Sequence, residues 1–167
     1  MSERSPVVGI YGLGRFGTFW GEVLSKEVKV IAASRSKKAN LPSGITQCSR
    51  EELAEAEAIF ICVAISAMDE SSLLLSRIVR PEQTILDTCS VKVYPSTIME
   101  TRFSPQQPLI ATHPMFGPDS ARNGVTGLPI IMHRLRNGEE SYRTWTERFS
   151  RMGLTIVEMS PDDHDKE

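Results

Sequence analysis

Three glycines near the amino terminus are spaced as G-x-G-x-x-G between an apolar run and a helical pattern. Gly12, Gly14 and Gly17 directly follow the run Val7–Tyr11. In this motif the first glycine permits a tight turn, the second lets the backbone approach a pyrophosphate, and the third lets the helix pack closely on the strand. The amino terminus of that helix offers unpaired N–H groups and a positive dipole end to an anion.

Apolar residues at helical spacing follow the motif, namely Phe16, Phe19, Trp20, Val23 and Leu24. The strand before the glycines and the helix after them are the context that the dinucleotide fingerprint requires. We therefore expect a dinucleotide to contact Gly12, Leu13, Gly14, Arg15, Phe16 and Gly17. The alternative is a glycine-rich turn within an ordinary α/β domain.

The segment after the second apolar run indicates which dinucleotide is bound. An NAD site carries an Asp or Glu about 20 residues beyond the glycines, where it binds the ribose 2′-hydroxyl. No carboxylate lies between Glu27 and Glu51, whereas Arg35, Lys37 and Lys38 cluster where the ribose would lie, with the hydroxyls of Ser34 and Ser36 beside Arg35. A guanidinium between two hydroxyls suits a 2′-phosphate, so we expect NADP rather than NAD. The neighbouring Lys37 and Lys38 could equally be part of a solvated loop.

His113 and Ser90 are the candidate catalytic residues. A neutral imidazole can accept the proton of an alcohol that is oxidised beside a bound nicotinamide. A serine hydroxyl can hydrogen-bond the same oxygen or orient the imidazole, and Ser90 is suited to that. The alternative for His113 is a surface or capping histidine.

Alternating strands and helices position these residues. Strands are expected at 7–11, 28–33, 58–64, 84–87, 109–112, 128–132 and 154–159, with 58–64 as the fourth strand. Helices are expected after the glycine turn and at 49–56, 68–79, 95–103 and 139–152. The pattern predicts an α/β fold with a Rossmann-like, doubly wound and mainly parallel sheet. Tyr142, Trp145 and Phe149 form an aromatic stripe that we expect in the core.

In such a sheet, ligands bind beyond the carboxyl ends of the strands. The glycine turn, the segment Cys89–Lys92 and the segment His113–Pro118 each follow a predicted strand, so all three should face one crevice. For the same reason we include Val63 and Ala64, at the end of an apolar strand, among the residues expected to contact the cofactor.

Composition excludes several classes of function. The 167-residue chain has a net charge of −2, which gives no overall field for nucleic acid or an anionic membrane. Its three cysteines lack CxxC spacing, and no apolar run is long enough to span a bilayer. We therefore expect a cytoplasmic protein. His133 and His164 lack a third ligand at suitable spacing, so we expect no metal site.

Two segments resemble the paired signatures of the arogenate/prephenate dehydrogenase family, most closely its plant and cyanobacterial arogenate-type members. They are Leu86–Lys92 and Thr112–Pro118, and the resemblance extends to the segment Val157–Asp165. Membership would imply NADP-dependent oxidative decarboxylation of arogenate or prephenate in tyrosine biosynthesis, with His113 as the base and Ser90 as its partner. Asp87 and Lys92 would form a loop-fixing ion pair or contact a ligand.

The resemblance also implies a domain division. Residues 1–160 would be the NAD(P)-binding domain, and 161–167 the start of a helical dimerisation domain that is otherwise absent. The full-length family is expected to form homodimers. We expect the acidic end of the chain to be frayed and His164 to be structural. The alternatives are a catalytically silent NADP-binding or partner-docking module, and another small NAD(P)-dependent dehydrogenase.

Overall fold

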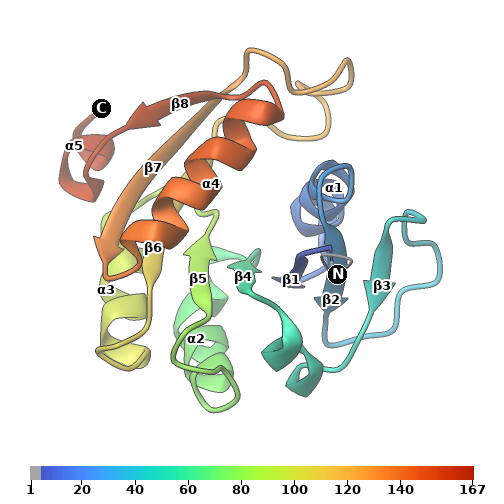
Figure 1. The fold of residues 1–167 in the computed structure, drawn as a ribbon, viewed down its shortest axis with the longest axis horizontal. Helices are drawn as coiled ribbons and strands as arrows, with labels where there is room; N and C mark the ends of the chain where they lie inside the picture. The colour runs from blue at the N-terminus through green and yellow to red at the C-terminus, as the bar shows by residue number, and fades with distance from the viewer. Residues whose placement is uncertain (1–4) are drawn as a thin grey trace.

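The computed structural model describes residues 5–167, which form an eight-stranded sheet with helices on both faces (Figure 1). The strands are β1 (Val7–Tyr11), β2 (Lys29–Ala33), β3 (Ile45–Gln47), β4 (Ala58–Ile61), β5 (Thr84–Asp87), β6 (Leu109–Pro114), β7 (Pro129–Arg136) and β8 (Thr155–Glu158). The α-helices are α1 (Arg15–Leu24), α2 (Met68–Ser76), α3 (Val93–Arg102), α4 (Glu139–Arg151) and α5 (Pro161–Lys166). The 3₁₀ turns η1 (Glu51–Glu55) and η2 (Ile65–Ala67) flank β4.

The strand order is β3-β2-β1-β4-β5-β6-β7-β8, and only the β6–β7 pairing is antiparallel within residues 5–167. The chain order reverses between β1 and β4, which makes this the topological switch point of a doubly wound sheet. Tyr11 pairs with Ile61, and Ile61 pairs with Asp87. The carboxyl ends of β1, β4 and β5 are therefore level, and the predicted Rossmann-like sheet is confirmed.

An aromatic cluster fills the core between the sheet and the helices α1 and α4. Trp20 from α1 and Phe60 from β4 meet Trp145 and Phe149 from α4, and the Phe60 and Trp145 ring centroids are 5.0 Å apart. All four side chains are buried. The prediction that the aromatic stripe of α4 is core is thus confirmed for Trp145 and Phe149, whereas Tyr142 is half-buried at the edge of the cluster. The cluster anchors the helix opened by the glycine turn.

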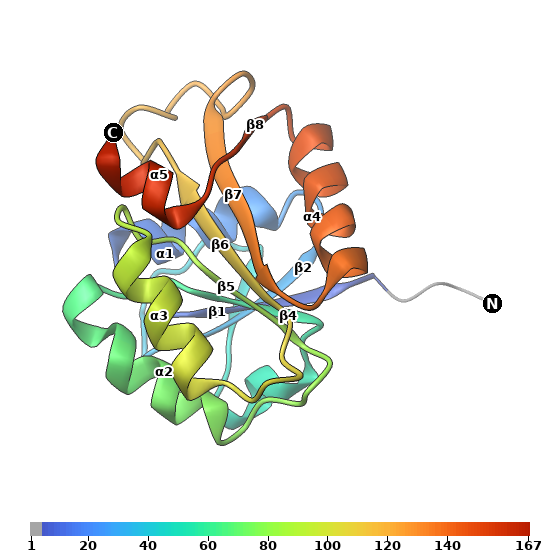
Figure 2. The same ribbon diagram turned by 90° about the vertical axis from the view of Figure 1, so that its left-hand side faces the viewer.

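The opposite face of the sheet is covered by η1, α2 and α3, through buried side chains that include Leu53, Leu75 and Met99. The short helix α5 lies beside α3 (Figure 2). It is joined to the start of α3 by Asp165, whose carboxylate accepts hydrogen bonds from the backbone N–H groups of Lys92 and Val93.

The structure differs from the sequence-based expectations at three places. The end of the chain is not frayed, because Ser160 caps α5 by accepting a hydrogen bond from the Asp163 backbone N–H at 3.2 Å. The strand β3 was not predicted, although it forms the edge of the sheet. The expected capping box is present, with Ser49 and Glu52 exchanging hydrogen bonds, but the helix it opens is the 3₁₀ turn η1.

No helix among residues 5–167 is long and apolar enough to cross a membrane.

Candidate active site

The glycine turn follows β1 and has no room for larger residues at two of its three glycines. Gly12 has φ of +108°, and a Cβ there would lie 2.3 Å from the Cys62 carbonyl oxygen. A Cβ at Gly17 would lie 1.9 Å from the Gly12 carbonyl oxygen. Gly14 is different, because a Cβ there would meet no atom within 4 Å. Packing thus explains Gly12 and Gly17, while the space beside Gly14 is open.

The helix α1 starts directly at this open space. Gly14 is its N-cap, no side chain caps its first turn, and no acidic residue lies in that turn. Its first N–H groups and positive dipole end therefore suit an anion. Phe16 is half-buried, and the side chain of Leu13 belongs to the core, so Leu13 can offer a ligand only its backbone. Arg15 is exposed and donates to Asp119 at 2.7 Å.

Val63 and Ala64 lie just beyond β4, beside the glycine turn. A Cβ at Gly12 would meet Val63 Cγ1 at 3.0 Å, which shows how closely the two segments approach. Val63 is half-buried and Ala64 is exposed. The structure therefore brings these two residues and the glycine turn to the same switch point.

The Ser34–Ser36 loop follows β2 and is folded by its own hydrogen bonds. The Ser34 hydroxyl donates to the Ser36 carbonyl oxygen at 2.5 Å and accepts from Gln47 Nε2 at 3.1 Å. Ser34 thus shapes the loop. The Arg35 guanidinium is exposed and donates to Glu70 Oε2 of α2 at 3.2 Å. An exposed ion pair of this kind is weak, so Arg35 is available to a stronger anion.

His113 is the penultimate residue of β6 and is half-buried. Its Nδ1 lies 2.9 Å from Nε2 of His164 on α5. Burial lowers the pKa of His113 to about 4, with smaller contributions from the charge of Lys92 and from electrostatic interaction with His164, against the opposing effect of Asp87. The imidazole of His113 is therefore neutral at pH 7 and able to accept a proton.

A buried ion pair fixes the two segments that carry Ser90 and His113. Lys92 Nζ donates to Asp87 Oδ2 and to the Thr112 carbonyl oxygen, and both charged side chains are almost fully buried. Asp87 also accepts from the backbone N–H groups of Cys89 and Thr112, each at 3.2 Å. Of the two roles left open for Asp87 and Lys92, the structure shows the loop-fixing one.

Ser90 is exposed in the loop that this ion pair holds. No hydrogen bond joins it to His113 in the part of the chain that the structure describes. The residue that does contact the His113 ring is His164, whose other nitrogen lies 2.7 Å from Asp165 Oδ1. The sequence offered only the adjacent His164–Asp165 pair as a signal of this contact, and its position near the end of the chain hid its role.

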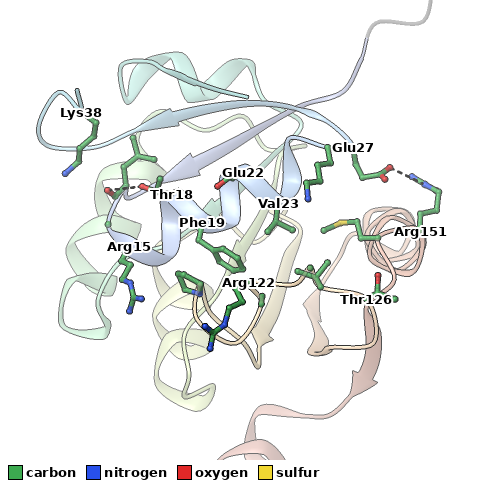
Figure 3. A pocket seen from close by; sticks show the side chains of 18 residues that line it. Arg15, Thr18, Phe19, Glu22, Val23, Glu27, Lys38, Arg122, Thr126 and Arg151 are labelled. Atoms are coloured by element: carbon green, nitrogen blue, oxygen red, sulfur yellow. Dashed lines mark hydrogen bonds and ion pairs between the residues drawn. The ribbon is translucent and has the colours of Figure 1, made fainter. Parts of the chain in front are cut away.

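A separate pocket lies elsewhere in the molecule. It has a volume of about 980 Å³ and lies between α1 and the loop that follows β6. Figure 3 shows Phe19 and Val23 of α1 facing Arg122 and Thr126 of that loop. Only Leu13, Gly14 and Arg15 of the glycine turn border it, and neither Ser90 nor His113 lines it. The candidate catalytic residues therefore lie outside this pocket.

Comparison with known proteins adds a family to this geometry. The model of the family "Prephenate dehydrogenase, nucleotide-binding domain" matches residues 24–128. Arogenate dehydrogenase 1, chloroplastic, of Arabidopsis thaliana is 32% identical over 171 residues, covering 95% of this chain and 27% of the relative. Arogenate dehydrogenase 2, chloroplastic, of the same plant is 28% identical, covering 95% and 48%. The chain thus spans less than half the length of these relatives.

Solved structures agree on the fold. Synechocystis arogenate dehydrogenase superposes with a TM-score of 0.79 at 21% identity, covering 96% of this chain and 62% of that one. Prephenate dehydrogenase from Aquifex aeolicus, in complex with hydroxyphenyl propionate and NAD⁺, superposes with a TM-score of 0.73 at 18% identity, and the match covers 99% of this chain and 63% of that one. Plasmodium falciparum pyrroline carboxylate reductase with NADP bound superposes with a TM-score of 0.77 at 15% identity, and the match covers 96% of this chain and 60% of that one.

Proposed function

This chain belongs to the family of prephenate dehydrogenase nucleotide-binding domains, and we propose that it binds NADP and supplies the base for oxidative decarboxylation of arogenate or prephenate. The observation that carries the proposal is the position of His113 at the carboxyl edge of the sheet that also holds the glycine turn. The names of the two Arabidopsis relatives favour arogenate as the substrate.

The residues at the switch point fit a dinucleotide. Gly14 leaves open space where packing alone would tolerate a side chain, and α1 begins there without a capping side chain. A pyrophosphate could therefore approach the backbone and accept hydrogen bonds from the first N–H groups of the helix. In this arrangement Val63 and Ala64 would contact the part of the dinucleotide that extends from the glycine turn toward His113.

In the proposed reaction the ring carbon that bears the 4-hydroxyl is oxidised and the ring carboxylate leaves as CO₂. NADP⁺, when bound, supplies the two-electron acceptor. His113 takes the proton of the 4-hydroxyl, because its depressed pKa keeps the imidazole neutral. Ser90, exposed on the neighbouring loop, can hydrogen-bond the same hydroxyl. Loss of CO₂ and formation of an aromatic ring drive the step forward, so the protein mainly orients the ring and accepts the proton.

The preference for NADP over NAD rests on Arg35. Its exposed guanidinium can exchange the weak ion pair with Glu70 for a dianionic 2′-phosphate. Ser36 lies beside it on the exposed side of the loop. The Glu70 carboxylate would repel a phosphate bound at Arg35, and its ion pair with Arg35 is the contact that the phosphate would replace.

Arg35→Ala is expected to weaken NADP⁺ binding by about 1.5–3 kcal/mol and to leave NAD⁺ binding nearly unchanged, because only NADP carries the 2′-phosphate. Isothermal titration calorimetry of the chain with each dinucleotide measures both affinities. Lys29→Ala, which removes an exposed charge at the opposite end of β2, is the matched control and should have a much smaller effect. Tighter binding of NAD⁺ than NADP⁺ by the unaltered chain would contradict the proposed preference.

Gly14→Ala and Gly17→Ala are expected to act on different properties. A methyl group at Gly14 enters open space, so stability should change by less than about 1 kcal/mol, while NADP⁺ affinity should fall at least about tenfold. A methyl group at Gly17 collides with the Gly12 carbonyl, so stability should fall by about 1–3 kcal/mol. Thermal unfolding and calorimetric titration separate the two effects. Unchanged NADP⁺ affinity in a folded Gly14→Ala variant would place the dinucleotide elsewhere.

A further inference from the structure

A chain of hydrogen bonds runs from the backbone at the start of α3 to the ring of His113. The Asp165 carboxylate accepts from the backbone N–H of Lys92 at 2.8 Å through Oδ1 and from that of Val93 at 2.9 Å through Oδ2. Oδ1 also lies 2.7 Å from His164 Nδ1, and His164 Nε2 lies 2.9 Å from His113 Nδ1. Three side chains on two separate elements are thus connected in a fixed order.

The series of hydrogen bonds begins at the Asp165 side chain, which is a carboxylate. Desolvation raises the pKa of Asp165, but hydrogen bonds from Val93, His164 and Lys92 outweigh it, so the net pKa lies below the usual value. At neutral pH this side chain is therefore ionised and only accepts hydrogen bonds. The proton in its bond with His164 must then be on Nδ1 of His164.

The ionised state of Asp165 determines which ring nitrogens of His164 and His113 donate and which accept. A neutral His164 with its proton on Nδ1 has a lone pair on Nε2. The bond to His113 then requires His113 to donate from Nδ1, which leaves the lone pair of His113 on its Nε2. A charged His164 would donate instead and would fix the opposite tautomer, so the Nδ1–H tautomer of His113 is expected at a pH where both rings are neutral. The charged groups that face His113 are Lys92 and Asp87, and Asp165 faces His164.

We propose that His164 and Asp165 are positioning residues that hold His113 in its Nδ1–H tautomer and thereby keep Nε2 as the atom that accepts the substrate proton. The proposal rests on the proposed function for the role of that proton acceptor. It assigns to α5 a task that Ser90 does not perform in this structure, since the ring of His113 contacts His164. The second nitrogen of a histidine commonly sets the tautomer of the first in this way.

The tautomer can be measured in the chain itself, without cofactor or substrate. Long-range ¹H–¹⁵N correlation spectra of the ¹⁵N-labelled protein at pH 8, where an unperturbed imidazole is neutral, report which nitrogen of each histidine carries the proton. We expect Nδ1 of His113 and Nδ1 of His164 to be protonated. A proton on Nε2 of His113 in the unaltered protein would overturn the proposal.

Variants of His164 test whether this residue sets the tautomer of His113. His164→Phe keeps a ring but removes the acceptor, so the Nδ1–H preference of His113 should be lost. His164→Gln places an amide oxygen near the former Nε2 position and should restore that preference. His133→Phe, on β7 opposite Ala111, is the matched control and should leave the tautomer unchanged. The same His113 tautomer in His164→Phe as in the unaltered chain would contradict the assignment.

The test of the His113 tautomer can fail or succeed independently of the test of the proposed function. If His164→Phe does not fold, the unaltered chain and His164→Gln still decide the tautomer. If the tautomer is as expected but His113 proves dispensable for turnover, the hydrogen-bonded chain stands and the reaction assignment fails. Where turnover is measurable, His164→Phe should lower kcat with little change in KM for NADP⁺, and His164→Gln should recover part of kcat.

Discussion

Replacing Lys92 with methionine is expected to lower the free energy of unfolding by about 3–5 kcal/mol. Methionine fills a similar volume but leaves the fully buried Asp87 carboxylate without its counter-ion. It also leaves the Thr112 carbonyl oxygen without the hydrogen bond from Lys92 Nζ. An unpaired charge in the interior is among the most destabilising changes that a single substitution makes. Urea denaturation monitored by circular dichroism measures the change.

The matched control is Lys37→Met, which removes an exposed lysine and should change stability by no more than about 0.5 kcal/mol. A loss below about 1 kcal/mol for Lys92→Met would mean that the Asp87–Lys92 pair contributes no more than an exposed ion pair. The loop that carries Ser90 and the β6 end that carries His113 would then be held together by other contacts.

His113→Asn is expected to reduce the turnover of arogenate by about 10²–10⁴-fold and to leave NADP⁺ affinity within about twofold. Asparagine keeps a polar atom near the Nδ1 position, so the contact with His164 can persist, but an amide cannot take up a proton at neutral pH. Steady-state kinetics, in the shortest form of the protein that turns arogenate over, measures kcat. Calorimetry of the 167-residue chain measures the affinity for NADP⁺.

His133→Asn serves as the control, because it changes a histidine on the adjacent strand β7 that forms no hydrogen bond with His113 among the described residues. It should leave kcat within about twofold, as expected of a substitution outside the reacting groups. Unchanged turnover in His113→Asn would remove the base assignment. The chain would then be better explained as a nucleotide-binding module.

The elements that place the site could be predicted because their signals are local. The strand β5 was predicted at its observed bounds, and the helices α3 and α4 to within two residues at each end. The strand β3 escaped prediction, because Ile45–Gln47 is too short to show alternation. The helix α5 had a signal, a serine cap followed by Pro161 at its first position, but its acidic composition favoured a solvated end.

The parts of the site that depend on tertiary contacts could not be predicted. The packing of Gly17 is local, since its nearest atom is the Gly12 carbonyl oxygen, whereas Gly12 packs against Cys62 and Val63 in the segment that follows β4. His164 lies 51 residues from His113 along the chain, and Glu70 lies 35 residues from Arg35. Nothing local in the sequence indicates that either pair meets. The sequence therefore indicated His113 as a candidate base but did not indicate the residue that contacts its ring.

The proposal that a dinucleotide brings its nicotinamide to His113 can be tested in one titration. The ¹⁵N-labelled chain is titrated with NADP⁺, and amide shifts are followed together with nuclear Overhauser effects between the nicotinamide and histidine ring protons. We predict shifts at Gly12–Gly17 and at Val63, and an Overhauser effect between the nicotinamide and the ring of His113. Saturable binding with shifts confined to the pocket between α1 and the loop after β6, and no effect at His113, would contradict the proposal.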